Sequence, residues 1–103
     1  MEVNREAEIM MKAIETYGAE NQQLKACEEC SELIKAIIKL RFAKPKGVEH
    51  DIICDAIAEE MADVEIMLHQ MQMIFHNFDK VKEYREKKLE RLERRLRDGN
   101  NGG

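Results

Sequence analysis

The sequence has no tryptophan, one proline, two tyrosines and three phenylalanines among its 103 residues, whereas Glu, Lys, Leu, Ile and Met are frequent. That balance favours helix over strand. No run of about 18 apolar residues is present, so a membrane-spanning helix is not expected. The N-terminal segment MEVNREAEIMMK lacks the apolar core of a signal peptide. Three cysteines, an odd number, are typical of a reducing compartment, and we expect a cytoplasmic protein.

Charge is distributed unevenly along the chain. Residues 1–79 carry 16 acidic and 8 basic side chains, whereas residues 80–97 carry 9 basic and 4 acidic ones. A general nucleic-acid binder would show a broad basic face, so we expect no nucleic-acid partner. The basic stretch is either a solvated helix face or a contact for phosphate groups.

Helical periodicity predicts four helices, over residues 3–17, 19–42, 51–76 and 79–97. Gly18 ends the first helix, and Pro45 and Gly47 interrupt the chain between the second and third. The expected fold is an all-α four-helix bundle formed by residues 1–97, followed by a flexible tail over residues 98–103. A domain of this size buries only roughly 60–70% of its unfolded surface, so we expect a homo-oligomer.

Apolar stripes follow the two long helices. The helix over 19–42 has one stripe at Leu24, Cys27, Ser31, Ile34 and Ile38, and a neighbouring one at Ala26, Cys30, Leu33, Ile37 and Leu40. An apolar face this wide is buried on more than one side. The apolar line of the next helix comprises Ile53, Ile57, Met61, Val64, Leu68, Met71, Phe75 and Phe78.

Two acidic patches interrupt these stripes. One is Glu28-Glu29-Cys-Ser-Glu32, and the other is Glu59-Glu60-Met-Ala-Asp63. Residues three apart lie about 60° from each other around a helix, so Glu29 and Glu32 share a face, as do Glu60 and Asp63. A short connection makes the two helices antiparallel neighbours, which allows the two patches to face each other.

Carboxylates that converge near a core repel one another, and a divalent cation removes that conflict. Oxygen ligands without an accompanying histidine point to Mg²⁺ or Mn²⁺ rather than zinc. Paired glutamates on helices are, however, common as solvated surface. A helical interaction or scaffold module without catalysis therefore remains an alternative.

At these patches the sequence resembles the MazG-like all-α nucleoside triphosphate pyrophosphohydrolases, in particular small stand-alone members of phage or bacterial type. The resemblance lies in Glu-Glu-x-x-Glu, 27 intervening residues and Glu-x-x-Asp, with flanking Gln22-Gln-Leu-Lys-Ala-Cys and Ala62-Asp-Val, and it covers roughly residues 17–95. It implies that Glu29, Glu32, Glu60 and Asp63 bind Mg²⁺, for which Mn²⁺ can substitute. It also implies hydrolysis of a nucleoside triphosphate to a monophosphate and pyrophosphate, in the house-cleaning of nucleotide pools. The resemblance further implies that the homo-oligomer is a dimer or a tetramer.

Other roles follow from this resemblance. Glu28 or Glu32 is the candidate general base for the attacking water. Lys88 and Arg91, on one face of the last helix, are candidates to hold pyrophosphate. Tyr17 is the candidate for stacking on the base and Gln22 for hydrogen bonds to it.

Two further enzyme-like alternatives are open. A phosphoribosyl-ATP pyrophosphohydrolase would share the fold and the acidic residues, although the wide spacing of the two patches is less similar to that family. Separately, Cys27, Cys30, His50 and Cys54 could supply a Cys₃His zinc site. Two of these cysteines lie in apolar stripes, where a free cysteine packs as a small hydrophobe.

Overall fold

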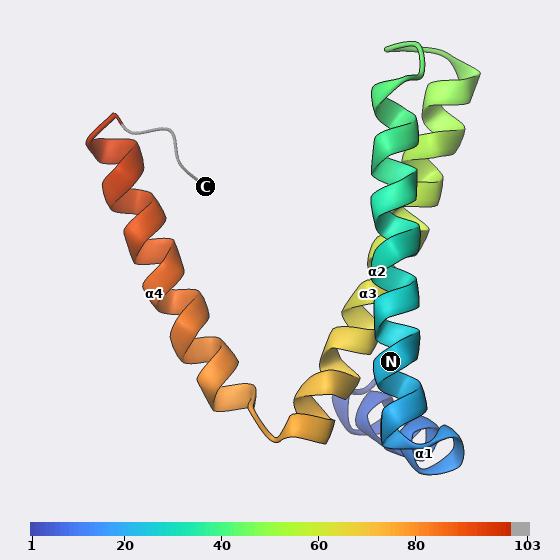
Figure 1. Ribbon diagram of the computed structural model, residues 1–103, viewed down its shortest axis with the longest axis vertical. Helices are drawn as coiled ribbons and strands as arrows, with labels where there is room; N and C mark the ends of the chain where they lie inside the picture. The colour runs from blue at the N-terminus through green and yellow to red at the C-terminus, as the bar shows by residue number, and fades with distance from the viewer. Residues whose placement is uncertain (100–103) are drawn as a thin grey trace.

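The computed structural model describes residues 1–99, which form four helices and no strand (Figure 1). The helices are α1 (Val3–Tyr17), α2 (Ala19–Arg41), α3 (Val48–Phe75) and α4 (Phe78–Arg97). The predicted all-α class is therefore confirmed. Of the tail predicted at 98–103, residues 100–103 lie outside the described part. Within residues 1–99, no helix is both long and apolar enough to span a membrane.

A single residue, Gly18, separates α1 from α2. Its φ of 93° and ψ of 145° define a backbone conformation that residues with a Cβ atom rarely adopt. The Gly18 N–H donates to the Ile14 carbonyl at 2.8 Å, and Asn21 Nδ2 donates to the Tyr17 carbonyl at 2.8 Å. Because these bonds satisfy carbonyls at the end of α1, the chain can turn within one residue.

The start of α3 differs from the prediction. The helix begins at Val48, three residues before Asp51, directly after Gly47 with its φ of 110°. The Asp51 N–H donates to the Gly47 carbonyl at 3.1 Å, so Asp51 lies inside the first turn, where an acid is favourable to the helix dipole. A start near Asp51, with Asp51 either as the N-cap or as an acid of the first turn, was predicted, and the second alternative is the one observed. The helix begins three residues earlier because a glycine turn, and not a polar capping side chain, precedes it.

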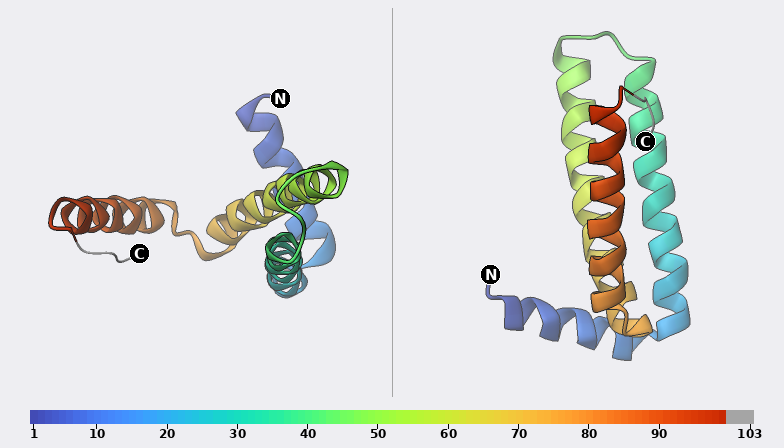
Figure 2. Two further views of the ribbon diagram at one scale, coloured as in Figure 1. Left: turned by 90° about the horizontal axis from the view of Figure 1, so that it is seen from above. Right: turned by 90° about the vertical axis from the view of Figure 1, so that its left-hand side faces the viewer.

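The packed part of the chain comprises α1, α2 and α3. Helices α2 and α3 run side by side and antiparallel, as predicted, and α1 crosses the end where α2 begins and α3 finishes (Figure 2). The core is small: Met10, Ala26, Ile53 and Met67 are its buried apolar residues. No large side chain in the described part of the chain is completely enclosed.

Helix α4 stands apart from the other three (Figure 1). It joins α3 through His76, in the left-handed conformation with φ 51° and ψ 47°, and Asn77. The edge-on contact of the His69 and Phe78 rings, with centroids 5.4 Å apart, holds the junction. The radius of gyration is 17.2 Å, whereas a compact domain of this length has about 13 Å. A single chain therefore forms only part of the predicted four-helix bundle.

Candidate metal and nucleotide site

Three carboxylates converge between α2 and α3. One carboxylate oxygen each of Glu29, Glu60 and Asp63 lies within 4.8 Å of the others. Glu29 is buried, and Glu60 and Asp63 are half-buried. In residues 1–99 this is the one group of three or more acidic, histidine or cysteine side chains close enough to hold a cation. We call these three residues the acid cluster; its oxygen-only donors suit Mg²⁺ or Mn²⁺.

Helical periodicity explains why the acids meet. Glu60 comes seven residues after Ile53 and seven before Met67, and both of these are buried at 4% and 6% exposure. Because seven residues are nearly two full turns, all three share the side of α3 that faces α2. On α2, Glu29 follows the buried Ala26 by three residues. The residues that pack the two helices together thus also bring the carboxylates together.

The cluster concentrates negative charge. Loss of solvation raises the pKa of Glu60 above its ordinary 4.5, and the nearby carboxylates of Asp63, Glu29, Glu32 and Glu59 raise it further. Glu32 lies at the edge: it is not within the 4.8 Å group, and its Oε1 lies 3.4 Å from Lys35 Nζ. A divalent cation would relieve this repulsion.

Lys25 is a neighbour of the cluster that the sequence interpretation missed. Its Nζ lies 3.2 Å from Glu29 Oε1 and 3.9 Å from Glu28 Oε1. The hydrogen bond to Glu29 and the charges of Glu28 and Glu29 raise the pKa of Lys25, so its ammonium group is favoured. The signal was in the sequence, because Lys25 precedes Glu28 and Glu29 by three and four residues, the spacing of helical neighbours.

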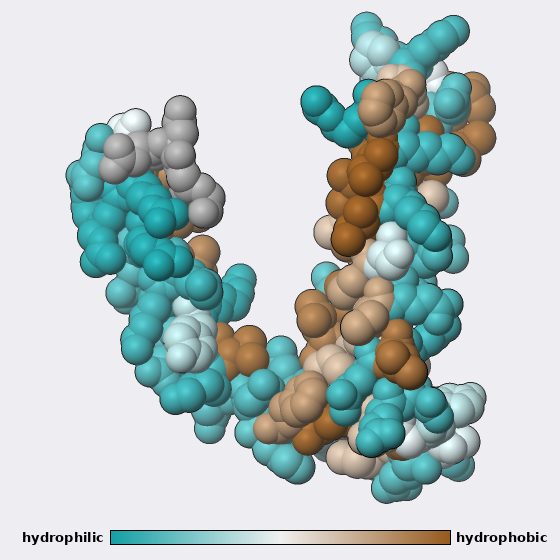
Figure 3. Space-filling view, viewed as in Figure 1, coloured by the Kyte–Doolittle hydropathy of each residue, from teal (hydrophilic) through white to brown (hydrophobic). Residues whose placement is uncertain are grey.

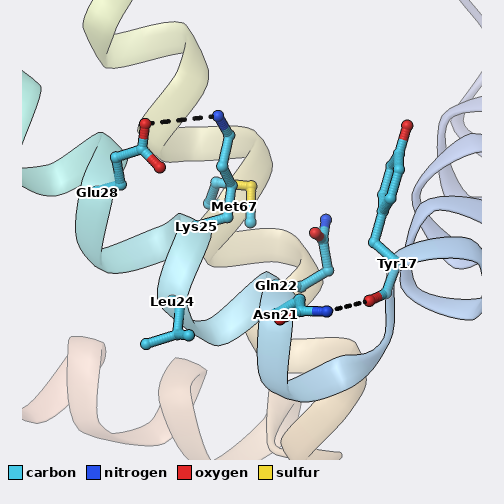
Figure 4. Close-up of a pocket in the computed structure, with 7 residues that line it drawn as sticks. All are labelled: Tyr17, Asn21, Gln22, Leu24, Lys25, Glu28 and Met67. Atoms are coloured by element: carbon cyan, nitrogen blue, oxygen red, sulfur yellow. Dashed lines mark hydrogen bonds and ion pairs between the residues drawn. The ribbon is translucent and has the colours of Figure 1, made fainter.

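A pocket of about 580 Å³ opens beside this lysine (Figure 4). Figure 4 shows Gln22, Lys25 and Glu28 in succession along α2, with Tyr17 at the far end. Three residues predicted from sequence, Tyr17, Gln22 and Glu28, therefore share one pocket next to the acid cluster. Its remaining lining residues are Asn21, Leu24 and Met67.

A buried hydrogen bond joins α2 and α3 at Gln22, which lines this pocket. Gln22 Nε2 donates to Gln70 Oε1 at 2.7 Å, and the two side chains are 7% and 4% exposed. The sequence interpretation missed Gln70. Its signal was the position seven residues after Asp63, on the same side of α3.

Other predicted residues are not brought to the cluster. Lys88 and Arg91 lie on α4, where they line a shallow hollow of about 390 Å³ with Tyr84. Beyond the contact of its first residue, Phe78, with His69, α4 does not pack along α2 or α3. The zinc alternative fails in the described structure, because its cysteines and histidine do not form a metal-holding group. Cys54 Sγ lies 3.8 Å from the His50 ring nitrogens, and Cys27 is exposed on α2.

Comparisons of the chain with family models, with curated proteins and with solved structures gave no match.

Proposed function

We propose that this chain is a magnesium-dependent pyrophosphohydrolase that cleaves a ribo- or deoxyribonucleoside triphosphate to the monophosphate and pyrophosphate, in nucleotide-pool house-cleaning. The observation that carries the proposal is the convergence of Glu29, Glu60 and Asp63 across two antiparallel helices. These are three of the four acids that the MazG-like resemblance assigns to metal binding, and the fourth, Glu32, lies at the edge.

The acid cluster fits a magnesium site by its chemistry. Its donors are carboxylate oxygens. The pKa of Glu60 is raised first by loss of solvation and then by the neighbouring carboxylates, whose negative charge a cation would neutralise. Glu29, Glu60 and Asp63 would hold the ion, with Glu32 beside them. When bound, Mg²⁺ supplies neutralisation of phosphate oxygens and orientation of the attacking water.

The pocket next to the cluster supports nucleotide as the substrate. Tyr17 offers an aromatic face for a base, and the Gln22 side chain, fixed by Gln70, offers amide groups for its edge. Lys25 places a cation between this pocket and the acids, where a triphosphate would lie. Of the two candidate general bases, Glu28 lines the pocket. In the described arrangement Lys88 and Arg91 can serve only a site on a neighbouring chain.

The direct test measures pyrophosphate and monophosphate released from a panel of nucleoside triphosphates, with Mg²⁺ and with EDTA. Magnesium-dependent release of both products is expected, and the panel ranks the bases. No release from any nucleotide by a folded sample would overturn the proposal and favour a scaffold role.

A matched pair of variants tests the site itself. Glu60→Gln removes one charge from the acid cluster and should lower kcat/KM by about 100-fold or more, as expected for loss of a ligand to a catalytic metal. Glu65→Gln makes the same chemical change on an exposed position of α3 outside the cluster and should leave kcat/KM unchanged. Equal activity of the two variants would contradict the assignment of the cluster.

A further inference from the structure

Two amide side chains of the pocket beside the acid cluster have their NH₂ groups bonded within the protein. Gln22 Nε2 donates to Gln70 Oε1 at 2.7 Å, and Asn21 Nδ2 donates to the Tyr17 carbonyl at 2.8 Å. Figure 4 draws the second of these bonds. Within residues 1–99, neither Gln22 Oε1 nor Asn21 Oδ1 accepts a hydrogen bond. Both amides therefore keep an oxygen atom available as an acceptor.

The Gln22 oxygen opens into the pocket. Gln22 is 7% exposed and lines the pocket, so the little surface that it keeps is pocket wall. Among the enclosed side-chain nitrogen and oxygen atoms of residues 1–99, only Asn77 Oδ1 lacks a partner. Since Gln22 Oε1 has no partner either, it is not enclosed. A ligand in the pocket can therefore reach it.

Gln70 determines which end of the Gln22 amide the ligand meets. If the Gln22 amide turned over, its Oε1 would face Gln70 Oε1, and two acceptors cannot form a hydrogen bond. Only a simultaneous turn of Gln70 would avoid this, and Gln70 is 4% exposed between α2 and α3. Leaving a buried polar group without its partner is unfavourable. The observed direction, with the Gln22 oxygen toward the pocket, is therefore the favoured one.

The pocket has the size and position for a base. Its volume of about 580 Å³ lies in the range of small-molecule sites. Figure 3 shows apolar surface along the side of the α2–α3 pair that faces α4, whereas polar and apolar surface mix where α1 meets α2, beside the pocket. Gln22 and Glu29 are seven residues apart on α2, about 10 Å along the helix. A nucleotide with its base at Gln22 can therefore direct its phosphates toward Lys25 and the acid cluster.

We propose that this pocket selects bases that carry an exocyclic amino group, cytosine and adenine, over uracil, thymine and guanine, and that Gln70 is the positioning residue for this selection. Cytosine and adenine offer an amino donor at the position where thymine, uracil and guanine carry a carbonyl acceptor. The donor pairs with Gln22 Oε1, whereas a carbonyl oxygen would face another acceptor. This inference rests on the proposed function, because it names the substrates of the same site.

The first test compares two pairs of nucleotides that differ chiefly in this one group. Cytidine triphosphate has an amino group where uridine triphosphate has a carbonyl, and adenosine and inosine triphosphate differ in the same way. With Mg²⁺, kcat/KM should be higher for the amino member of each pair by about tenfold or more, since a site built to hydrogen-bond a group rejects the analogue without it. Equal values within both pairs, or a preference for the carbonyl members, would overturn the proposal.

Three variants test the role of Gln70. Gln70→Met keeps the length of the side chain but removes the acceptor, so Gln22 can turn and the ratio of the two kcat/KM values should fall toward one. Gln70→Glu keeps an acceptor oxygen and should keep the preference. Gln23→Met makes the first change at a position of α2 outside the pocket lining and should leave the ratio unaltered. A purely structural role of Gln70 would lower both kcat/KM values alike, and an unchanged ratio in Gln70→Met would refute its positioning role.

Binding without catalysis separates this inference from the enzyme itself. Titration calorimetry of the full chain with cytidine and uridine triphosphate in EDTA gives a ratio of dissociation constants that needs no hydrolysis. Tighter binding of cytidine triphosphate without hydrolysis in Mg²⁺ would refute the enzyme and leave the base selection standing. Hydrolysis of both nucleotides at the same kcat/KM, with equal binding, would leave the enzyme standing and refute the selection.

Discussion

Gln22 and Gln70 form a buried hydrogen bond, 2.7 Å from Nε2 to Oε1, that ties α2 to α3. Both side chains lie among residues that otherwise pack through apolar contacts, such as Ala26 and Met67. A polar pair inside a small core fixes the position of one helix along the other, because sliding would leave both amides buried without partners.

Replacing one of these two glutamines should therefore lower the free energy of unfolding more than replacing both. Gln22→Leu or Gln70→Leu alone is expected to lower the free energy of unfolding by about 1–3 kcal/mol, the cost of an unsatisfied buried polar group. The double variant should recover part of that loss. Denaturant unfolding measures it, with Gln23→Leu as the control on the same helix. Additive losses would show that the two amides act independently.

Magnesium should stabilise the folded chain through the acid cluster. At a free concentration of ten times its dissociation constant, a ligand at one site contributes about 1.4 kcal/mol, which raises the unfolding midpoint by about 5–10 °C. Glu60→Gln should abolish most of this rise, and Glu65→Gln should not. A midpoint that is insensitive to millimolar Mg²⁺ in the wild-type chain would contradict a metal site.

The raised pKa of Glu60 predicts a pH dependence in metal-free protein. The folded state binds this proton more tightly than the unfolded state, so the stability from Glu60 is complete below its ordinary 4.5 and is lost as the pH rises through the raised pKa. Glu60→Gln, neutral at every pH, should therefore gain stability relative to wild type between about pH 4 and pH 7. Urea unfolding at the two pH values, after removal of metal, measures the difference. If the difference in the free energy of unfolding between the two proteins stays constant with pH, the pKa of Glu60 is not raised in the folded state.

If the acid cluster binds a divalent cation as proposed, Lys25 would compete with that cation for Glu29. Because Lys25 Nζ lies 3.2 Å from Glu29 Oε1, replacing the lysine by glutamine should tighten Mg²⁺ binding in the absence of nucleotide. A decrease of roughly fivefold in the dissociation constant is expected for removal of a nearby positive charge. Titration calorimetry measures it, with Lys39→Gln as the control further along α2. Weaker binding by Lys25→Gln would mean that the ammonium group supports the metal site.

Much of the local structure followed from sequence. The helix ends depend on Gly18, Gly47 and the break around Pro45, and the predicted boundaries differ from the observed ones by three residues at most. The convergence of Glu29, Glu60 and Asp63 followed from helical spacing and an antiparallel pair of helices. The helix ends and the acid cluster both depend on residues that are near in sequence or on one short connection between helices. Local sequence patterns specify such features well.

Contacts between distant parts of the chain were harder to predict. The apolar periodicity of α4 shows that Leu89 and Leu92 need a partner, but it does not show on which chain that partner lies. For the same reason Lys88 and Arg91 could not be placed relative to the acids. Gln70 was missed because its position seven residues after Asp63 indicates only the side of α3 on which it lies, and not that Gln22 of α2 faces it.

On helix α3, Asp63 lies about 140–160° around the helix from the apolar residues Met61 and Leu68, and this arrangement restricts how the sequence can change. Inserting or deleting one residue between Asp63 and Leu68 would rotate everything beyond it by about 100°. The apolar line would then be split, and Gln70 would turn away from Gln22. Substitutions leave this geometry intact. In an evolving lineage, the number of residues between Glu60 and Phe75 should therefore vary less than their identity.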